Sequence, residues 1–482
     1  MYDVLIIGCG IVGAALSYEL SKFELAVAIV EKDNDVANAT SKANSAIIHA
    51  GYDPEPGTLM AKLNVEGSSM AKKLCTDLDV PYKQIGSLVL AFDKEELPLL
   101  EELYERGVTN GVPDMKLLDG EAVKKLEPNV NPDVRAGLYA ASTAIVSPWE
   151  YALAMAETAV QNGAELFLNS KVTAIERIDA GYRVRTSSGS FEAKYVLNAS
   201  GTHGDTIHNM IAEPEFKITP IRGQYYLLDK SEGTRVNHVI FQCPTKKGKG
   251  VLVAPTVHGN LIAGPDSEDV PDRENTATTS YGLSHVMNAA RKSIASINFR
   301  ESVRNFSGVR AASDHPDFIL AESKTAKGFY DIAGIKSPGL SAAPAIAKMA
   351  AGLLQEAGLA LKEKEDYCKK RKKIRFNDLP IEEKNRLIIK NPAYGRVICR
   401  CETVTEGEII NALHSPIIPH SIDGVKRRCN AGMGRCQGGF CGPRVLEIMS
   451  RELKLPPEKI VQDKEESIVI IGETKAGGLT NV

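Results

Sequence analysis

The sequence predicts an α/β fold with a Rossmann-like βαβ domain, a second domain built on an antiparallel sheet, and a small helical domain near the C-terminal end. Three observations predict it. A short apolar run at residues 4–7 leads into a glycine-rich turn and a helical segment. Strand-and-turn segments occupy parts of the middle of the chain, and five of the nine cysteines follow residue 398. A chain of 482 residues also exceeds what one hydrophobic core usually serves, so about two or three domains are expected.

The first βαβ unit has the pattern of a dinucleotide site. Residues 4–7 and 27–30 are continuous apolar runs, as in strands that are buried on both faces of a parallel sheet. Between them, the glycines of the turn allow a tight bend, a close approach to pyrophosphate and close packing of the helix, whose N-terminus faces the phosphates. The residues of this turn are Gly8, Gly10, Ile11, Val12 and Gly13.

An acidic residue completes the pattern. Glu31, followed by Lys32, ends the second strand, where a carboxylate can accept hydrogen bonds from ribose hydroxyls. A purely structural glycine turn is the alternative. The position of the site does not by itself separate FAD from NAD.

The chain then alternates between two larger domains. A helix over residues 147–162 that opens at Pro148, and strands near 165–168, 172, 182–186 and 195–198, continue the first domain. This domain regains a strand at 329–334 and a helix from about Pro344 to Glu356. Strands at 85–92, 223–229, 251–255 and 261–264 predict a second sheet that covers the substrate. The charged residues 362–373 indicate a solvated helix face or a linker, with a docking surface for an acidic partner as the alternative.

Two close pairs of cysteines follow. Cys399 and Cys401 are separated by one residue, Cys436 and Cys441 by four, and 34 residues lie between the pairs. They can converge on one centre if the intervening chain makes a helix and returns. Neighbouring glycines free backbone amides to approach sulfides, which suits a 2Fe-2S cluster, but the same thiols could close a structural zinc site. Cys429 could replace one ligand, although its position outside both pairs favours a non-ligand role.

Composition excludes several classes of protein. An apolar content of 43%, a charged content of 25% and a formal charge of −3 give no reason to expect a nucleic-acid partner. Nine cysteines do not make a disulfide framework in a chain of this length, so we expect a reducing compartment. The chain shows no export signal and no apolar stretch of about 18 residues, so we expect a cytoplasmic protein without a transmembrane segment. Peripheral association with the inner face of the membrane is compatible with this expectation.

Several blocks of the sequence resemble known families. Residues 40–51, 196–201, 308–311 and 334–344 resemble the successive FAD-contacting blocks of the D-amino-acid-oxidase-like flavoprotein superfamily. Residues 397–408 and 432–444 resemble bacterioferritin-associated-ferredoxin-like domains. The chain is most similar to glycerol-3-phosphate dehydrogenases of the anaerobic type, whose catalytic subunit carries such a domain, and to L-2-hydroxyglutarate dehydrogenases or oxidases. The resemblance covers nearly all of residues 1–450 and implies FAD and a 2Fe-2S cluster.

The resemblance also implies the residues that hold FAD. It places Ser41, Lys42, Asn44 and Ser45 near the flavin and its phosphates, and the backbone of Val172 at the adenine edge. It places Ser200 and Gly201 at the pyrophosphate. Gly339 and Leu340, in the block that begins at Gly334, would lie at the pyrimidine end of the flavin. A helix that starts near Ser341 would present amides to the flavin, where negative charge accumulates on reduction. An ordinary Pro-Gly turn is the alternative for residues 337–340.

The implied domains are discontinuous. The FAD-binding domain takes residues 1–84, 145–212 and 325–361, the substrate domain 85–144 and 213–324, a linker 362–394, the 2Fe-2S domain 395–460 and a tail 461–482. The tail is expected to dock as an extended edge.

Five residues are candidates for handling the substrate. His49 is the first candidate for the base, because an imidazole near its ordinary pKa suits proton transfer at neutral pH; packing against the flavin is the alternative. Arg310 resembles the arginine by which relatives hold an acidic group with two bonds, with a surface ion pair as the alternative. Lys336 and Arg222 are further cations that could hold the acidic group of the substrate. Tyr225 could cap the pocket.

We therefore expect an FAD-dependent dehydrogenase of a small anionic alcohol, namely sn-glycerol 3-phosphate, with dihydroxyacetone phosphate as the product. Electrons would leave singly through the cluster to a quinone-linked acceptor or to a partner, such as a second flavoprotein or an electron-acceptor subunit. One alternative is an L-2-hydroxyglutarate dehydrogenase. Another is an electron-transfer subunit whose flavin and cluster serve no substrate of their own.

Overall fold

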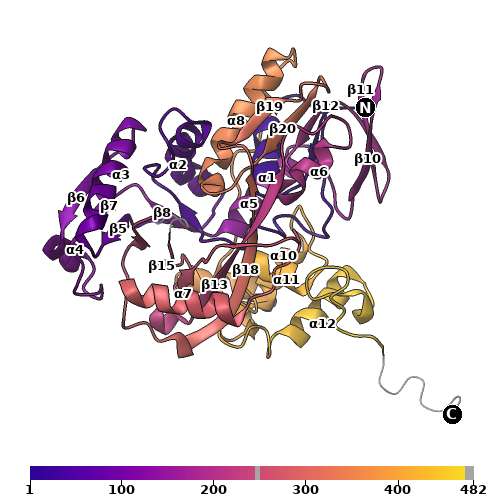
Figure 1. Ribbon diagram of the computed structural model, residues 1–482. Helices are drawn as coiled ribbons and strands as arrows, with labels where there is room; N and C mark the ends of the chain where they lie inside the picture. The colour runs from indigo at the N-terminus through magenta and orange to yellow at the C-terminus, as the bar shows by residue number, and fades with distance from the viewer. Residues whose placement is uncertain (245–249, 473–482) are drawn as a thin grey trace, which may run out of the picture. The chain divides into compact units, whose positions relative to one another are not determined.

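The computed structural model describes residues 1–244 and 250–472. The chain forms two compact units (Figure 1). The first contains residues 1–32 and 36–371, and the second contains residues 33–35 and 372–482. Among the helices of the described residues, none combines the length and the apolar character that crossing a membrane requires.

An eight-stranded sheet forms the first half of unit 1. Its order is β10 (Val172–Ile178), β11 (Gly181–Thr186), β12 (Ser190–Asn198), β1 (Tyr2–Ile7), β2 (Val27–Val30) and β9 (Glu165–Phe167), with β20 (Phe329–Ala333) beside β12 and β19 (Ile319–Glu322) beside β20. Strand β1 pairs in parallel with β2 and β12, and β2 is fully buried. The predicted βαβ unit is confirmed. Strand β19 joins this sheet, although its residues fall in the span expected for the substrate domain; the predicted domain division itself stays a prediction.

Four helices pack together in one group that contacts this sheet. Helix α1 (Ile11–Leu20) contacts both α5 (Pro148–Gln161) and α8 (Gly339–Glu356), and α2 (Leu59–Asp77) also packs on α8. The prediction that α8 begins near Pro344 is wrong, because the helix begins five residues earlier and Pro344 lies inside it. Most residues from 339 to 347 are buried. Packing therefore favours the longer helix although a proline inside it lacks one hydrogen bond.

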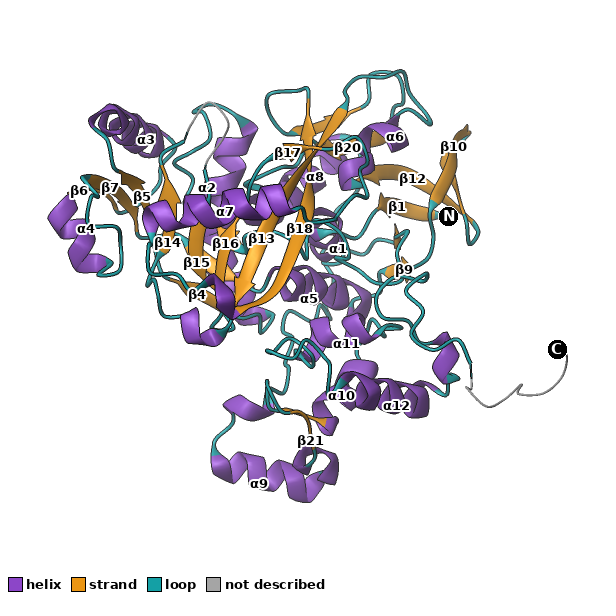
Figure 2. Ribbon diagram, turned by 60° about the horizontal axis from the view of Figure 1, so that its bottom comes forward, coloured by secondary structure: helices purple, strands orange, loops and turns teal. Residues whose placement is uncertain are grey.

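A nine-stranded, mostly antiparallel sheet forms the second half of unit 1. Its order is β17 (Glu268–Asp269), β13 (Ile218–Leu228), β16 (Leu261–Gly264), β15 (Leu252–Pro255), β14 (Val239–Gln242), β5 (Ser87–Ala91), β7 (Ala136–Ala140) and β6 (Met115–Asp119), with the long β18 (Ser302–Ser313) on β13. Helix α7 (Ser280–Ser293) lies across one face (Figure 2), and α3 (Leu97–Thr109) contributes to the apolar core on the other. The predicted second sheet is confirmed.

A small third sheet lies close to the predicted flavin-contacting segment. It pairs β3 (Ile47–Ile48) and β4 (Tyr82–Gln84) with β8 (Ala144–Val146). All three strands are antiparallel, and both residues of β3 are buried. Strand β3 therefore fixes the backbone on the N-terminal side of His49.

Unit 2 is mainly helical. It contains α9 (Ile381–Lys390), α10 (Glu406–Leu413), α11 (Ile422–Cys429) and α12 (Gly442–Leu453), with the short pair β21 (Val397–Cys399) and β22 (Val404–Thr405) (Figure 2). The span expected as a linker thus holds helix α9, and residues 362–371, which lie in unit 1, form no helix. In the tail, Val461 bridges to Ser421 and Ile468. Residues 473–482 lie outside the described residues, so the expectation for that part stays a prediction.

Buried charges connect the segments of unit 2. The Asp35 carboxylate accepts hydrogen bonds from Arg427 Nη2 at 2.8 Å and from Arg428 Nη1 and Nη2 at 2.9 and 3.0 Å. Arg427 also bonds Asp463, and Asn34 Nδ2 donates to the Asp463 carbonyl at 2.7 Å. Breaking a buried ion pair by removing one partner is costly because the other charge is left unpaired. Residues 33–35 are therefore an integral part of the C-terminal unit.

Replacing Asp35 tests this role. We expect Asp35→Ala to reduce the stability of unit 2 by about 3–5 kcal/mol, because two buried guanidiniums lose their shared carboxylate. The measurement is hydrogen exchange of the backbone amides of α11, followed by mass spectrometry. Asp463→Ala is the control and should cost about 1 kcal/mol or less, since its side chain is 25% exposed and its charges are better solvated than those of the Asp35 pair.

The ion pairs of Asp35 with Arg427 and Arg428 also predict that the stability of unit 2 depends on pH. Burial alone would raise the pKa of the Asp35 carboxyl, but the charges of Arg428 and Arg427 hold it far below its usual range. Its contribution is therefore fully present above about pH 4, the ordinary pKa of an unfolded aspartate, and is lost as the pH falls towards the lowered folded pKa. Equal exchange of α11 in Asp35→Ala and in the parent chain would contradict the assignment.

Candidate active site and cysteine centre

The turn between β1 and α1 is closed by backbone contacts. Gly8 has φ +94°, and a Cβ at Gly13 would lie 1.9 Å from the Gly8 carbonyl oxygen. The Glu31 carboxylate accepts the Cys9 N–H at 2.7 Å. The N–H groups of Val12 and Gly13 have no acceptor among the described residues. The first turn of α1 thus presents two free backbone N–H donors, and the close contact between Gly13 and Gly8 leaves no room for a side chain at Gly13. Such a turn can bind a pyrophosphate group.

Residues 38–46 form the turn that flanks this loop. Ser41 Oγ accepts the Ile11 N–H at 2.8 Å, so Ser41 lies at the start of α1. Asn44 stabilises the turn through the carbonyls of Thr40 and Ser41 and through the Ala46 N–H. Lys42 Nζ donates to Asn38 Oδ1 at 2.5 Å. The residues expected near the flavin and its phosphates, Ser41, Lys42, Asn44 and Ser45, therefore lie in one turn, and Ser41 bonds the start of α1.

A buried polar network supports the other side of the glycine turn. Ser200 Oγ donates to Asn198 Oδ1 at 2.6 Å, and Asn198 Nδ2 donates to Asp331 Oδ1 at 2.7 Å. His208 Nδ1 lies 2.6 Å from Asp331 Oδ2. Burial alone would lower the pKa of His208, but the Asp331 carboxylate raises it. Since a Cβ at Gly8 would lie 3.2 Å from Ser200 Cα, this network holds Ser200 and the adjacent Gly201 beside the turn.

The sequence patterns missed this network. The one available signal was a lone aspartate, Asp331, inside the apolar strand β20. Of the other expected cofactor residues, Val172 is buried at the start of β10, and Lys32 forms an ion pair with Glu274 at 3.1 Å. Their assignment to FAD stays a prediction.

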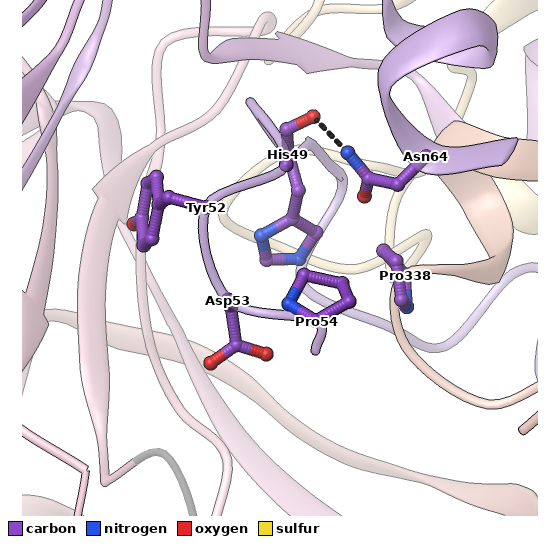
Figure 3. Close-up of a pocket in the computed structure, with 7 residues that line it drawn as sticks. His49, Tyr52, Asp53, Pro54, Asn64 and Pro338 are labelled. Atoms are coloured by element: carbon purple, nitrogen blue, oxygen red, sulfur yellow. Dashed lines mark hydrogen bonds between the residues drawn. The ribbon is translucent and has the colours of Figure 1, made fainter. Parts of the chain in front are cut away.

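His49 is held between β3 and α8. Its N–H donates to Ser341 Oγ at 2.8 Å, and its carbonyl accepts from Asn64 Nδ2 at 3.0 Å. The ring stacks on Phe241 with centroids 5.8 Å apart. Figure 3 shows the imidazole inside a pocket that is lined by His49, Gly51, Tyr52, Asp53, Pro54, Asn64 and Pro338. Ser341 and Asn64 fix the backbone of His49 from both sides; sequence reasoning missed Asn64, whose signal was an asparagine among apolar residues of α2.

Arg310 carries a positive charge without a carboxylate partner. It lies on β18, half-buried, and Nη2 donates to the Asp266 carbonyl at 3.2 Å. Within the described ranges, no carboxylate oxygen lies within 4.0 Å of its guanidinium. The neighbouring strand β13 carries Arg222, whose charge is neutralised by Glu268 at 2.7 Å. Arg310 is thus better placed than Arg222 to hold an anion from outside the chain.

Tyr225 and Lys336 differ in how firmly they are placed. Tyr225 stacks on Phe306 with centroids 4.8 Å apart, and its hydroxyl lies 3.2 Å from Ser45 Oγ. Lys336 is half-buried in the loop before α8, where its carbonyl accepts the Gly339 N–H at 2.6 Å. Gly334 has φ +66° in the same loop, and Leu340 lies in the first turn of α8. In the described part of the chain, the residues that line the His49 pocket do not include Arg310, Lys336 or Tyr225.

In unit 2 the four cysteines form two thiol pairs. Cys401 Sγ lies 3.6 Å from Cys436 Sγ, and the thiols of Cys399 and Cys441 are hydrogen-bonded to each other. The Cys441 thiol and the amides of Gly432 and Glu402 lower the pKa of Cys399 to about 6. Among the described residues, no three metal-binding side chains surround a single point. Two separate pairs suit a centre with two irons better than a single zinc ion, which takes all four ligands.

Cys429 stands apart from both pairs. Its thiol donates to the Val425 carbonyl at 3.3 Å within α11, and burial raises its pKa to about 12. The placement of Cys429 therefore supports the expected non-ligand role.

Comparisons with known proteins agree with this geometry. Residues 3–353 match the family model described as FAD dependent oxidoreductase. Residues 397–451 match the model described as BFD-like [2Fe-2S] binding domain. The first match covers the glycine turn and the His49 pocket, and the second covers all four paired cysteines.

Individual proteins are similar over long spans. A glycerol 3-phosphate dehydrogenase of Caloramator mitchellensis is 49% identical over 99% of each chain. The FAD-bound structure of L-alpha-glycerophosphate oxidase from Mycoplasma pneumoniae has a TM-score of 0.73 at 34% identity and covers 77% of this chain and 98% of that chain. A mitochondrial L-2-hydroxyglutarate dehydrogenase of Caenorhabditis elegans is 33% identical over 59% of this chain and 68% of its own length.

A substitution in the glycine turn tests the FAD site. We expect Gly13→Ala to purify with little or no FAD, because its methyl group would overlap the Gly8 carbonyl and distort the phosphate-binding loop. The measurement is the flavin released per protein on denaturation. Gly352→Ala is the matched control, since a Cβ at this helical position meets no atom within 4 Å and should leave FAD content unchanged. Full FAD content in Gly13→Ala would contradict the assignment.

Serine substitutions test the cysteine centre. We expect Cys436→Ser to lose most of the bound iron and the electron paramagnetic resonance (EPR) signal of the reduced cluster, because the Cys401/Cys436 pair loses a thiolate. Cys429→Ser should retain both, since this thiol donates to the Val425 carbonyl within α11 and belongs to neither thiol pair. Iron content and low-temperature EPR provide the measurement. Loss of iron in Cys429→Ser with retention in Cys436→Ser would exclude the assigned ligand set.

Proposed function

The chain belongs to the FAD dependent oxidoreductase family, and from this premise we propose that it oxidises sn-glycerol 3-phosphate to dihydroxyacetone phosphate. Identity of 49% over 99% of both chains to a glycerol 3-phosphate dehydrogenase supports this substrate. The structural observation that carries the proposal is the half-buried Arg310 without a carboxylate partner among the described residues, since it fits the anionic group of the substrate.

Arg310 would hold the phosphate group. A guanidinium presents two parallel donors to a phosphate, and such charge-assisted bonds position as well as attract. Tyr225 would cap the substrate pocket, because its ring is held against Phe306 and its hydroxyl against Ser45. Lys336 would add a second positive charge near the start of α8.

His49 would accept the proton of the substrate hydroxyl. Its side chain lines the pocket, and its backbone is fixed by Ser341 and Asn64. An imidazole is the side chain best suited to proton transfer near neutral pH. Asn64 and Ser341 would act as positioning residues, because they bond the backbone of His49 rather than its ring.

The cofactor would be held by the elements that meet at α1 and α8. The free amides of Val12 and Gly13 and the side chain of Ser41 would bind the pyrophosphate, and Glu31 the ribose. The first turn of α8, with Gly339 and Leu340, would face the flavin. FAD, when bound, supplies the hydride acceptor for the carbinol carbon.

The thiol pairs of unit 2 would pass the electrons on. Cys399, Cys401, Cys436 and Cys441 would hold a 2Fe-2S cluster, which supplies transfer of single electrons. Substrate oxidation releases two electrons, so a cluster suits an acceptor that takes them one at a time. We propose that this acceptor is a partner protein or a quinone-linked carrier, and that the enzyme works in the cytoplasm or at the inner face of the membrane. The domain boundaries predicted above are part of the same proposal.

Oxidation of L-2-hydroxyglutarate is a second candidate. The 33% identity to a C. elegans L-2-hydroxyglutarate dehydrogenase supports it. Arg310 does not distinguish the two substrates, since both carry an anionic group near the hydroxyl-bearing carbon. Steady-state dye reduction with each substrate separates them, and a higher kcat/KM for L-2-hydroxyglutarate would overturn the first proposal.

Anaerobic titration tests the function directly. Addition of glycerol 3-phosphate to the purified protein should bleach the flavin absorbance and then produce the EPR signal of a reduced cluster. Bleaching without any partner protein distinguishes an enzyme from a relay subunit. No change of either signal with glycerol 3-phosphate would sink the proposal.

A charge substitution tests the role of Arg310. We expect Arg310→Gln to lower kcat/KM for glycerol 3-phosphate by about 100-fold, mainly through KM, because a charge-assisted bond to the phosphate is lost. Dye-coupled steady-state kinetics provide the measurement. Arg304→Gln is the control, since Arg304 lies on the same strand β18 and is exposed. Equal kcat/KM in the two variants would show that Arg310 does not bind the substrate.

A further inference from the structure

The two thiol pairs of unit 2 differ in exposure. Cys399 and Cys441 are 1% and 2% exposed, whereas Cys401 is exposed and Cys436 is half-buried. The Cys401/Cys436 pair is therefore the side of the cysteine centre that is nearest to solvent. Electrons that leave the centre for another molecule have their shortest route through this side.

The exposed aromatic ring of Phe440 lies next to the Cys401/Cys436 pair. The Phe440 N–H donates to the Cys436 sulfur and lowers the pKa of that thiol. The Phe440 side chain, in contrast, is 85% exposed. Its backbone is thus fixed against a ligand of the centre while its ring points into solvent. Aromatic side chains and arginines are enriched at the centres of protein interfaces, so an exposed ring beside a redox centre, together with arginines, is a candidate interaction site.

Three arginines lie in the sequence close to the paired cysteines and to Phe440. Arg400 lies between Cys399 and Cys401, Arg435 precedes Cys436, and Arg444 follows Cys441 by three residues; all three are exposed. In the described residues, no carboxylate oxygen lies within 4.0 Å of the Arg400 guanidinium, whereas Arg444 pairs with Glu447. Residues 399–402 and 432–444, taken together with Glu447, contain three arginines and two acids, Glu402 and Glu447, although the whole chain has a charge of −3. The cysteine loops are therefore locally basic.

We propose that Phe440 with Arg400, Arg435 and Arg444, here named the Phe440 face, is the docking surface for an acidic one-electron carrier protein. The proposal rests on the proposed function, since the electrons come from substrate oxidation. Each substrate molecule releases two electrons, which would reduce two carrier molecules in succession at this face. Phe440 would be the apolar anchor, and the arginines would attract and orient the carrier.

The positive charge of the Phe440 face favours an acidic carrier over the other possible binding partners. A second copy of this chain would bring the same arginines together, and like charges in contact are unfavourable. A basic carrier would be repelled for the same reason. A single exposed ring, rather than a broad apolar surface, suits a transient electron-transfer complex, which buries little area.

Electron transfer to two haem proteins of opposite charge tests the proposal. The enzyme, reduced either with glycerol 3-phosphate or with dithionite and freed of excess reductant, is mixed with cytochrome b5, which is acidic, or cytochrome c, which is basic. We expect faster reduction of cytochrome b5, with a rate that falls as salt rises. Phe440→Ala should lower the second-order rate with cytochrome b5 by about tenfold or more, and leave both dye reduction and the cluster EPR signal unchanged.

Two further variants sharpen the test. Ile389→Ala is the matched control, because Ile389 lies on α9 in the same unit and is 84% exposed; it should not change the rate. Arg400→Gln should lower the rate at low salt and flatten its salt dependence. Altered EPR in Arg400→Gln would mean a changed cluster, so Arg444→Gln then supplies the charge measurement.

Each contrary outcome overturns a specific claim. Equal rates of Phe440→Ala and the parent chain, faster reduction of cytochrome c, or no reduction of cytochrome b5 by the dithionite-reduced enzyme would overturn the docking proposal. Sedimentation with phosphatidylglycerol vesicles that is lost in Phe440→Ala would assign the face to a membrane surface instead. Failure of glycerol 3-phosphate to reduce a dye, with normal transfer from the dithionite-reduced enzyme, would overturn the proposed function and leave the docking surface supported.

Discussion

The hydrogen bond from the His49 N–H to Ser341 Oγ joins the two segments on which the candidate active site depends. It ties the end of β3 to the first turn of α8, and α2 approaches the same turn so closely that a Cβ at Gly67 would lie 2.1 Å from the Ser341 carbonyl oxygen. Asn64, on α2, bonds the His49 carbonyl. Three backbones are thus locked around one turn, so the imidazole and the start of α8 keep a fixed geometry relative to each other.

Unit 2 relies on a comparable constraint, made with charges instead of close backbone contacts. Asp35 satisfies the buried guanidiniums of Arg427 and Arg428, which lie on the helix that precedes the second cysteine loop. The thiols are also organised by backbone amides and by one another. Cys399 and Cys441 pack in addition into the apolar core of unit 2, so charges, amides and apolar packing together position the sulfur atoms.

The two units also separate two kinds of chemistry. In unit 1, the proposed roles of Arg310, which has no carboxylate partner among the described residues, and of His49 are to hold and deprotonate an anionic alcohol that loses a hydride and a proton. In unit 2, paired thiols serve single electrons. Hydride transfer requires a closed, oriented site, whereas electron transfer requires a centre close to solvent. The burial of the His49 segment and the exposure of Cys401 follow these opposite requirements.

The sequence by itself determined the βαβ unit, the second sheet and the cysteine pairs, because continuous apolar runs, turn glycines and thiol spacing are local patterns. It also indicated His49 and Arg310, through resemblance rather than spacing. Only the tertiary structure decided that α8 begins at Gly339, that Asp35 belongs with Arg428, and that Asn64 and Ser341 hold His49. It also decided that Arg222 pairs with Glu268, whereas Arg310 has no carboxylate partner among the residues that the structure describes. These facts depend on contacts between residues tens to hundreds of positions apart, and burial and pairing at such separations are properties of the packed chain, which no local pattern specifies.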